Sequence, residues 1–263
     1  MGFPMIGAKH PDTLKAKGTH ILSICDARSE EAQRLSLECE RVTTERLRYL
    51  ANHRQEMQPL ELKLHRINAA LSDLNSRSSA AQYLFQSKKR RLSIEQENLL
   101  EQIATISGKS KRFLHELWED YRYHVERLER KFKKRDLILE NVTTTIGRGV
   151  LAQRLGGDTT YTGTVNYTAL GSDNTAADVS DATLGTEVYR KAISSGTDAA
   201  NIAYLETFFS ASETSGTYEE YGNFIDGAAG ADTGQLFNRF VSSITKSLTE
   251  TLNVQSIITF NDA

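Results

Sequence analysis

The sequence is poor in cysteine, proline and tryptophan, and cysteine is the residue that cross-links small secreted folds. Among its 263 residues are two Cys, three Pro and one Trp. Two cysteines cannot form a disulfide framework. Cys25 and Cys39 lie two heptads apart, so we expect both to be small apolar residues on one helical seam. A disulfide between chains of an oligomer is the alternative.

Long apolar runs are also missing. No stretch reaches the ~18 apolar residues of a membrane-spanning helix, and the first residues lack the apolar core of an export signal. We therefore expect neither a membrane anchor nor a cleaved signal. Pro4, Pro11 and Gly18 instead favour an extended arm over residues 1–20, ordered only against a neighbour.

Charge is distributed unevenly along the chain. Residues 1–140 hold 26 Lys and Arg against 20 Asp and Glu, whereas residues 141–263 hold 6 against 14. Because the sequence also becomes rich in Thr, Ser and Gly near position 140, we predict two domains that meet there. A basic and an acidic domain would dock onto different surfaces. A solvated helix with surplus Lys and Arg is the simpler interpretation of the basic half.

The first domain has the period of an α-helix. Apolar residues recur at alternating spacings of three and four, which is typical of a heptad seam. We predict that residues 21–140 form an α-helical coiled coil or helical bundle, and that the seam joins copies of the chain. The predicted seam consists of Ala32, Leu35, Cys39, Val42, Met57, Leu60, Leu64, Ile67, Leu71 and Leu74.

Three interruptions decide between a rod and a folded bundle. Pro59 lacks the N–H that a helix interior needs, residues 75–79 are typical of a turn, and Gly108 with Ser110 is typical of a helix stop followed by an N-cap. Breaks at these points would give antiparallel hairpins. Because the seams are narrow, we favour an interrupted coiled coil.

The second domain has the period of a β-strand. Val165, Tyr167 and Ala169 alternate with polar residues, and the pattern recurs over residues 203–209 and 254–260. Turn-forming Gly, Asn, Asp and Ser separate these runs. Residues 141–263 are therefore predicted to form an antiparallel β-sandwich-like domain or a partly closed barrel. The expected fold class is α+β in two segregated parts.

Four pieces of this second domain are similar to a known family. A short extended piece turns at glycine into a helix, an Ala-Leu-Gly loop and an acidic, glycine-containing link follow, and two strands close the domain. In this order they resemble a small β-domain of virion proteins of tailed bacteriophages, found in tail fibres, baseplates and related appendages. The family usually has a Pro near Ala176 or Ala177, which this chain lacks. The pieces are residues 142–157, 167–175 with 181–191, 210–224, and 234–246 with 252–260.

The resemblance implies a structural component of a phage virion, a tail fibre, collar or baseplate protein assembled in the host bacterial cytoplasm. It also implies a homo-oligomer, with a trimer as first choice, that contacts other virion proteins of the tail or capsid. A capsid-attached head fibre or decoration protein is the alternative within this class. A receptor-recognition module for a host surface glycan or protein is another, and its predicted contact surface is Tyr218, Glu219, Glu220, Tyr221 and Phe224.

The candidate catalytic motifs are few, and each lacks a residue that its chemistry requires. His115-Glu-Leu-Trp-Glu119 has Glu where a zinc-binding helix needs its second His. Asp232-Thr-Gly lacks the second copy that an aspartic-protease dyad needs. An envelope-degrading enzyme would need a close carboxylate pair that we do not find. We therefore expect a protein that acts by contact, with no catalytic residue and no cofactor.

Ligand-binding motifs are equally weak. Asp173, Asn174, Asp178 and Asp181 offer oxygens to calcium, but they lack the regular alternation of an EF-hand loop, so we expect no metal. Basic runs at residues 88–91 and 131–135 have few aromatic neighbours and are followed by acidic residues. We therefore expect no nucleic-acid partner.

Overall fold

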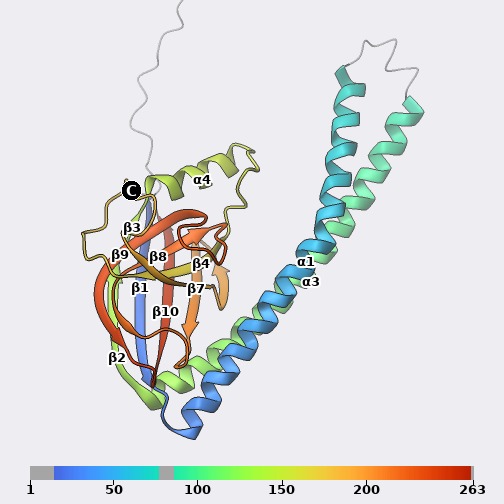
Figure 1. Cartoon of the computed structure of the whole chain (residues 1–263). Helices are drawn as coiled ribbons and strands as arrows, with labels where there is room; N and C mark the ends of the chain where they lie inside the picture. Colours follow the sequence, from blue (N-terminus) through green and yellow to red (C-terminus); the bar gives the residue numbers. More distant parts are fainter. Residues whose placement is uncertain (1–14, 77–85, 262–263) are drawn as a thin grey trace, which may run out of the picture. The chain divides into compact units, whose positions relative to one another are not determined.

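The structure is a computed structural model that describes residues 15–76 and 86–261. It contains two long helices and a β-region of two antiparallel sheets, so the predicted α+β class with segregated helical and β-parts is confirmed (Figure 1). The chain divides into two compact units. One is Thr44–Glu119, and the other combines the described residues before Thr44 and after Glu119. Both long helices contribute to both units.

In the unit Thr44–Glu119, α1 (Glu30–Ser76) and α3 (Gln86–Phe132) form an antiparallel hairpin. The rings of Tyr49 and Phe113 lie 4.5 Å apart, and Lys63 Nζ lies 3.0 Å from Glu95 Oε1. Low-numbered residues of α1 thus contact high-numbered residues of α3. The unit adopts the folded-back alternative within one chain. No helix among the described residues has an apolar stretch long enough to cross a membrane.

Two of the predicted helix breaks are wrong. α1 continues through Pro59 and α3 continues through Gly108 and Ser110. Pro59 and Gly108 are exposed, while Ser110 is buried. Helices of this length offset the local cost of one Pro or Gly through many other contacts. α1 ends at Ser76, inside the third predicted interruption, whose last residues lie outside the described part of the chain.

The β-region consists of two five-stranded antiparallel sheets. Sheet A has the order β2 (Lys133–Glu140), β1 (Lys15–Asp26), β10 (Glu250–Asn261), β7 (Ile202–Phe209), β6 (Ser195–Ala199). Sheet B has the order β3 (Val142–Thr143), β9 (Gln235–Lys246), β8 (Gly216–Ile225), β4 (Val165–Gly171), β5 (Glu187–Ala192). The edge strands of the two sheets are consecutive in the chain, so the chain passes directly from one sheet to the other at both sides.

Strands β1 and β2 correct the predicted boundaries. The predicted helical range 21–140 includes the second half of β1 and all of β2, and the predicted arm over residues 1–20 enters β1 at Lys15. Residues 1–14 lie outside the described residues. Leu22 and Ile24, two residues apart, are buried in the same core cluster, as expected for one face of a strand. The two helices are therefore an insertion between neighbouring strands of sheet A.

The main core lies between the sheets. Leu22, Leu252 and Phe209 of sheet A pack with Tyr221 and Phe240 of sheet B. The predicted strands over residues 165–169, 203–209 and 254–260 are confirmed as parts of β4, β7 and β10. The predicted closing strands are also present as β9 and β10, but they lie in different sheets and do not pair.

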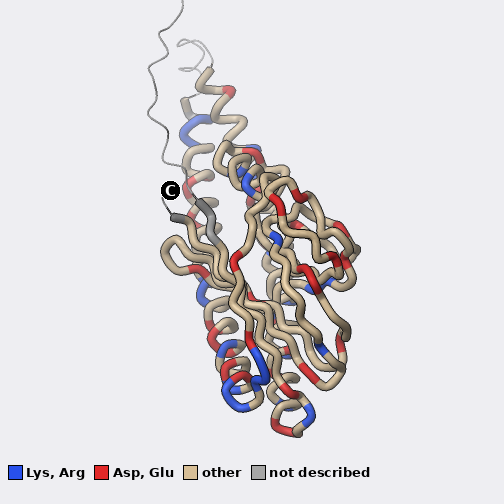
Figure 2. Tube along the Cα trace, turned by 90° about the vertical axis from the view of Figure 1, so that its left-hand side faces the viewer, with Lys and Arg blue, Asp and Glu red and all other residues tan. Residues whose placement is uncertain are grey.

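Helices cover two further surfaces of the β-region. α4 (Thr145–Leu155) begins at the N-cap Thr144, whose Oγ1 accepts from Gly147 N at 3.0 Å, and its Val150 packs with Phe237 and Ile258. It lies at one end of the strands in Figure 1. On the outer face of sheet A, Tyr121 of α3 donates to Asn253 Oδ1 at 3.0 Å. Charges of both signs alternate along the long helices, whereas the loops of the β-region carry mostly Asp and Glu (Figure 2).

Candidate functional site

The predicted contact surface is wrong. Tyr218, Glu220, Tyr221 and Phe224 are fully or almost fully buried, and Glu219 is half-buried. Tyr218 and Tyr221 point into the core between the sheets. Phe224 faces the other side of sheet B, where it packs with Leu184. A receptor-binding patch therefore cannot be built from these aromatic rings.

The predicted seam residues lie in both units. Ala32, Leu35, Cys39 and Val42 are buried within the unit that contains the β-region. In the hairpin unit, three residues are buried and three are half-buried. The buried ones are Met57, Ile67 and Leu74, and the half-buried ones are Leu60, Leu64 and Leu71. The four seam residues in the unit with the β-region already have an apolar environment within one chain. A contact between chains through these residues stays a prediction.

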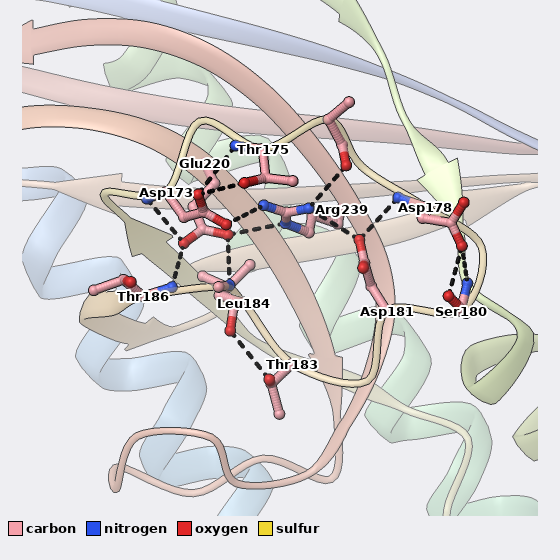
Figure 3. Close-up of polar contacts among 12 residues, drawn as sticks. Asp173, Thr175, Asp178, Ser180, Asp181, Thr183, Leu184, Thr186, Glu220 and Arg239 are labelled. Carbon is pink, nitrogen blue, oxygen red and sulfur yellow. Dashed lines mark hydrogen bonds and ion pairs between the residues drawn. The ribbon is translucent and has the colours of Figure 1, made fainter.

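The most highly connected polar site lies on the outer face of sheet B, around Glu220 of β8 and Arg239 of β9 (Figure 3). Arg239 Nε donates to Glu220 Oε2 at 2.9 Å, and both side chains are buried. Glu220 also accepts two short backbone bonds, from Gly185 N at 2.9 Å and Thr186 N at 2.7 Å. The carboxylate thus connects the sheet to the loop of residues 172–186.

Arg239 holds the same loop at three further points. Its Nη1 donates to Asp181 Oδ2 at 3.0 Å and lies 3.4 Å from the carbonyl oxygen of Ala176, and its Nη2 donates to Asp173 Oδ2 at 3.3 Å. One guanidinium therefore holds the first ten residues of a 15-residue connection between β4 and β5, and Glu220 holds its last two. We call Arg239, Glu220, Asp173 and Asp181 the loop anchor.

Close packing supports the loop anchor. A Cβ at Gly171 would lie 2.6 Å from the carbonyl oxygen of Thr186 and would also strike the Glu220 carboxylate. Only glycine leaves room for this approach. Leu184, at the far end of the loop, is buried with Ala169, Phe224 and Leu236. The loop therefore covers the outer face of sheet B as a fixed layer.

The residues considered for calcium do not form an ion site. Asp173 and Asp181 both bind the Arg239 guanidinium, while Asp178 accepts from the backbone N–H and the hydroxyl of Ser180. Asn174 is exposed. Among the described residues, no group of three or more His, Cys, Asp and Glu is placed to hold a metal. The arginine supplies the positive charge that a cation would have supplied.

The pKa shifts of Arg239 and Asp173 keep these two groups charged. Burial opposes the charge of Arg239, but its bonds to Glu220 and Asp181 outweigh burial and raise the pKa of the guanidinium. Hydrogen bonds from the backbone and hydroxyl of Thr175 lower the pKa of Asp173. Neither shift moves a group toward neutral pH, where a general acid or base works best. The arrangement fixes a loop and is not suited to proton transfer.

A second arginine anchors the neighbouring loop. Arg190 Nη2 donates to Glu187 Oε2 at 2.6 Å, and Arg190 Nη1 donates to the carbonyl oxygen of Thr233 at 2.9 Å and that of Ala228 at 3.1 Å. The guanidinium carbon lies 4.5 Å from the ring centroid of Phe224. The loop between β8 and β9 is therefore held by the same device as the loop before β5.

A third ion pair, between a partly exposed arginine and a buried carboxylate, lies on the opposite side of the β-region, where α3 contacts sheet A. Arg122 Nη1 lies 3.0 Å from Glu206 Oε1, and Glu206 Oε2 accepts from Asn253 Nδ2 at 3.0 Å. Glu206 is fully buried in the middle of β7, and burial raises the pKa of this carboxyl. This pair joins the inserted helix to the sheet.

These ion pairs were not predicted from the sequence, although the sequence contains a signal for the pairs of Arg239 and Arg190. Residues 141–263 contain only six Lys and Arg against 14 Asp and Glu. An arginine within a strand pattern, such as Arg190 or Arg239, must therefore meet carboxylates in almost any fold. Which carboxylates it meets depends on loop paths that periodicity does not reveal.

No protein-family model matches the sequence, and no curated protein is similar to it.

Proposed function

We propose that the chain is a structural subunit of a tailed-phage virion, most directly of a tail fibre, collar or baseplate, and that it acts by contact. The sequence resemblance over residues 142–260 motivates this proposal. The observation that carries it is the architecture: a long helical hairpin is inserted into a two-sheet β-region whose outer loops are fixed by buried ion pairs. Such a chain combines a spacer with rigid surfaces for neighbours.

The dimensions suit a spacer. Each long helix has 47 residues, which corresponds to a length of about 70 Å at ~1.5 Å per residue. A hairpin of two helices leaves part of its apolar seam open, because a helix pair covers only one side of each seam. Leu60, Leu64 and Leu71 are accordingly only half-buried.

We further propose that these half-buried residues join hairpins of several copies into a coiled-coil bundle, with a trimer as the first choice of oligomer. The apolar period of the seam supports this assembly. Neighbouring virion proteins of the tail or capsid would contact the β-region. A capsid-attached head fibre or decoration protein differs from this proposal only in the location of the chain on the particle.

A receptor-recognition module for glycans loses its predicted surface, because the aromatic residues Tyr218, Tyr221 and Phe224 are buried. The carboxylates of the loop anchor are bound to Arg239 and to backbone N–H groups. This favours a protein that acts by contact, without turnover. Incubation with host envelope fractions should show stoichiometric attachment or none, and no released sugar or peptide. Turnover that is lost in Asp181→Asn would overturn the structural proposal.

The direct test uses purified particles of the phage that encodes the chain. Quantitative mass spectrometry should find the chain at a copy number that is a multiple of its oligomeric state, and antibodies against the β-region should label the tail. Labelling of the head would favour the capsid-attached alternative. Complete particles that lack the chain would overturn the proposal.

A further inference from the structure

A chain of hydrogen-bonded polar side chains crosses the core between the two sheets. The hydroxyls of Thr207 and Thr168 lie 2.8 Å apart, and Thr168 Oγ1 lies 2.8 Å from Asn223 Oδ1. Asn223 Nδ2 donates to Asn238 Oδ1 at 3.0 Å and to Ser256 Oγ at 2.9 Å. All five side chains belong to residues that are fully or almost fully buried.

The chain ends at His20 of β1. Ser256 Oγ lies 2.7 Å from His20 Nδ1, and the imidazole stacks on Phe240 with ring centroids 4.0 Å apart. Ser256 Oγ accepts from Asn223 and keeps its own proton, and we assign this proton to a hydrogen bond donated to His20 Nδ1. Nδ1 is then an acceptor, so the ring proton of the neutral imidazole sits on Nε2. Burial lowers the pKa of His20 to about 3, which agrees with a neutral ring.

Three side chains at this end have buried polar atoms without a hydrogen-bond partner in the part of the chain that the structure describes. These atoms are His20 Nε2, Asn238 Nδ2, and both Nδ2 and Oδ1 of Asn141. Buried polar groups of native proteins are almost always satisfied by protein or by ordered water. Several unsatisfied atoms in one region therefore point to a shared ligand.

The strand register brings these side chains to the same corner of the β-region. Asn141 lies between β2 and β3, its backbone N–H donates to the Gly18 carbonyl oxygen at 3.2 Å, and its amide carbon would lie 2.6 Å from a Cβ at Gly18. His20 is the next residue of β1 on the same face as Gly18. Asn238 pairs with Thr143, two residues beyond Asn141.

We propose that this corner binds an ordered water molecule that accepts hydrogen bonds from His20 Nε2 and Asn238 Nδ2 and donates one to Asn141 Oδ1. Buried waters typically make about three hydrogen bonds to groups of this kind. The water extends the polar chain to the point where the protein passes from sheet A to sheet B. It joins β1, β9 and the connection between β2 and β3, and it does not depend on the proposed function.

The chemistry of the partners selects water over an ion. His20 Nε2–H and the two amide nitrogens are donors, which disfavours a metal cation. A buried anion would need a compensating positive charge, and the three side chains are neutral. Water alone both accepts from the donors and donates to the Asn141 oxygen.

Two measurements on the full chain test this site. Long-range ¹H–¹⁵N spectra at pH 7, with His20 assigned through bonds from its backbone, should show the Nε2–H tautomer and a ring N–H that exchanges slowly enough to be observed. A crystal structure at a resolution that orders internal waters should show a density peak within hydrogen-bond distance of His20 Nε2 and of at least one of the two amides.

Three results would contradict the proposed water site. An Nδ1–H tautomer would remove the donor on which the site depends and would overturn the proposal. A direct contact between His20 Nε2 and Asn141 Oδ1, with no density between them, would also overturn it. An anomalous bromide peak at the same position in crystals soaked with bromide would assign the site to an anion instead.

Discussion

Arg239 and Glu220 lie side by side on the outer face of sheet B, buried and joined at 2.9 Å between Nε and Oε2. Neither residue contributes to the apolar core, yet their remaining bonds all reach the loop of residues 172–186. The pair therefore converts a long surface connection into a fixed layer. This relationship makes the loop anchor the most informative place for mutation.

Glu220→Gln should destabilise the protein and release the loop. The substitution leaves a buried guanidinium without its main counter-charge, and removing one partner of a buried pair costs about 3–5 kcal/mol. Chemical denaturation measures the loss, and hydrogen exchange should show faster exchange at Gly185 and Thr186. The control is Asp178→Asn in the same loop, since this side chain is exposed and bonds only Ser180 and its own turn. Equal behaviour of the two variants would contradict the anchoring role.

Gly171→Ala and Gly149→Ala should change stability in opposite directions. An added methyl group at Gly171 meets the Thr186 carbonyl oxygen and the Glu220 carboxylate, whereas one at Gly149 within α4 meets nothing within 4 Å. We expect a loss of about 1–3 kcal/mol at Gly171 from overpacking and a gain of up to about 1 kcal/mol at Gly149 from helix propensity. Thermal unfolding of both variants measures the difference, and stabilisation by Gly171→Ala would show that the loop is not tightly packed.

Acid should destabilise the protein through His20. Burial lowers the pKa of this imidazole to about 3 in the folded state, against about 6.5 for an exposed histidine. The unfolded chain therefore binds a proton first as the pH falls, so stability is lost from about pH 6.5 down to about pH 3. The slope is about 1.4 kcal/mol per pH unit within that window.

The comparison variant for this titration is His20→Gln, which keeps a polar side chain but does not titrate. Other groups also titrate in acid, so the informative quantity is the difference between the two profiles of unfolding free energy against pH. This difference should change with pH between about pH 6.5 and pH 3 and stay constant above pH 7. A constant difference across the whole range would mean that His20 keeps an ordinary pKa in the fold.

Replacing Leu64 and Leu71 together with Ala should lower the oligomer mass in solution. Both residues are half-buried in the hairpin, so each has apolar surface left to place against another copy. A buried Leu→Ala change costs about 2–5 kcal/mol per site. Light scattering measures the mass, and circular dichroism checks that the helices remain. Leu62→Ala is the matched control, because Leu62 is 53% exposed on the same helix. An unchanged mass for the double variant would assign these residues to the hairpin alone.

Periodicity predicted much of the fold. The alternation at residues 165–169, 203–209 and 254–260 identified strands, because half-buried strands impose a period of two on the sequence. The spacing of three and four identified the long helices. Strands β1 and β2 were missed because both adjoin the heptad pattern directly. In β1, the adjacent apolar pairs Ile21-Leu22 and Ile24-Cys25 also hide the period of two.

The candidate site was harder to predict for a physical reason. Alternation tells which residues share a face of a strand, but not what covers that face. Phe224 lies opposite the main core and was expected to be exposed, yet Leu184 of the loop and the Arg190 guanidinium cover it. The loop of residues 172–186 is bonded to Arg239, which lies more than 50 residues further along the chain, so sequence periodicity could not reveal this contact.

The most direct test of the structural role is a cryo-electron microscopy map of the intact phage particle. We predict density for the two-sheet β-region and for the antiparallel helical hairpin, repeated with the symmetry of one particle substructure and with the hairpins of neighbouring copies in contact. A complete particle map in which every density is accounted for by other chains would contradict the proposal that this protein is a virion subunit.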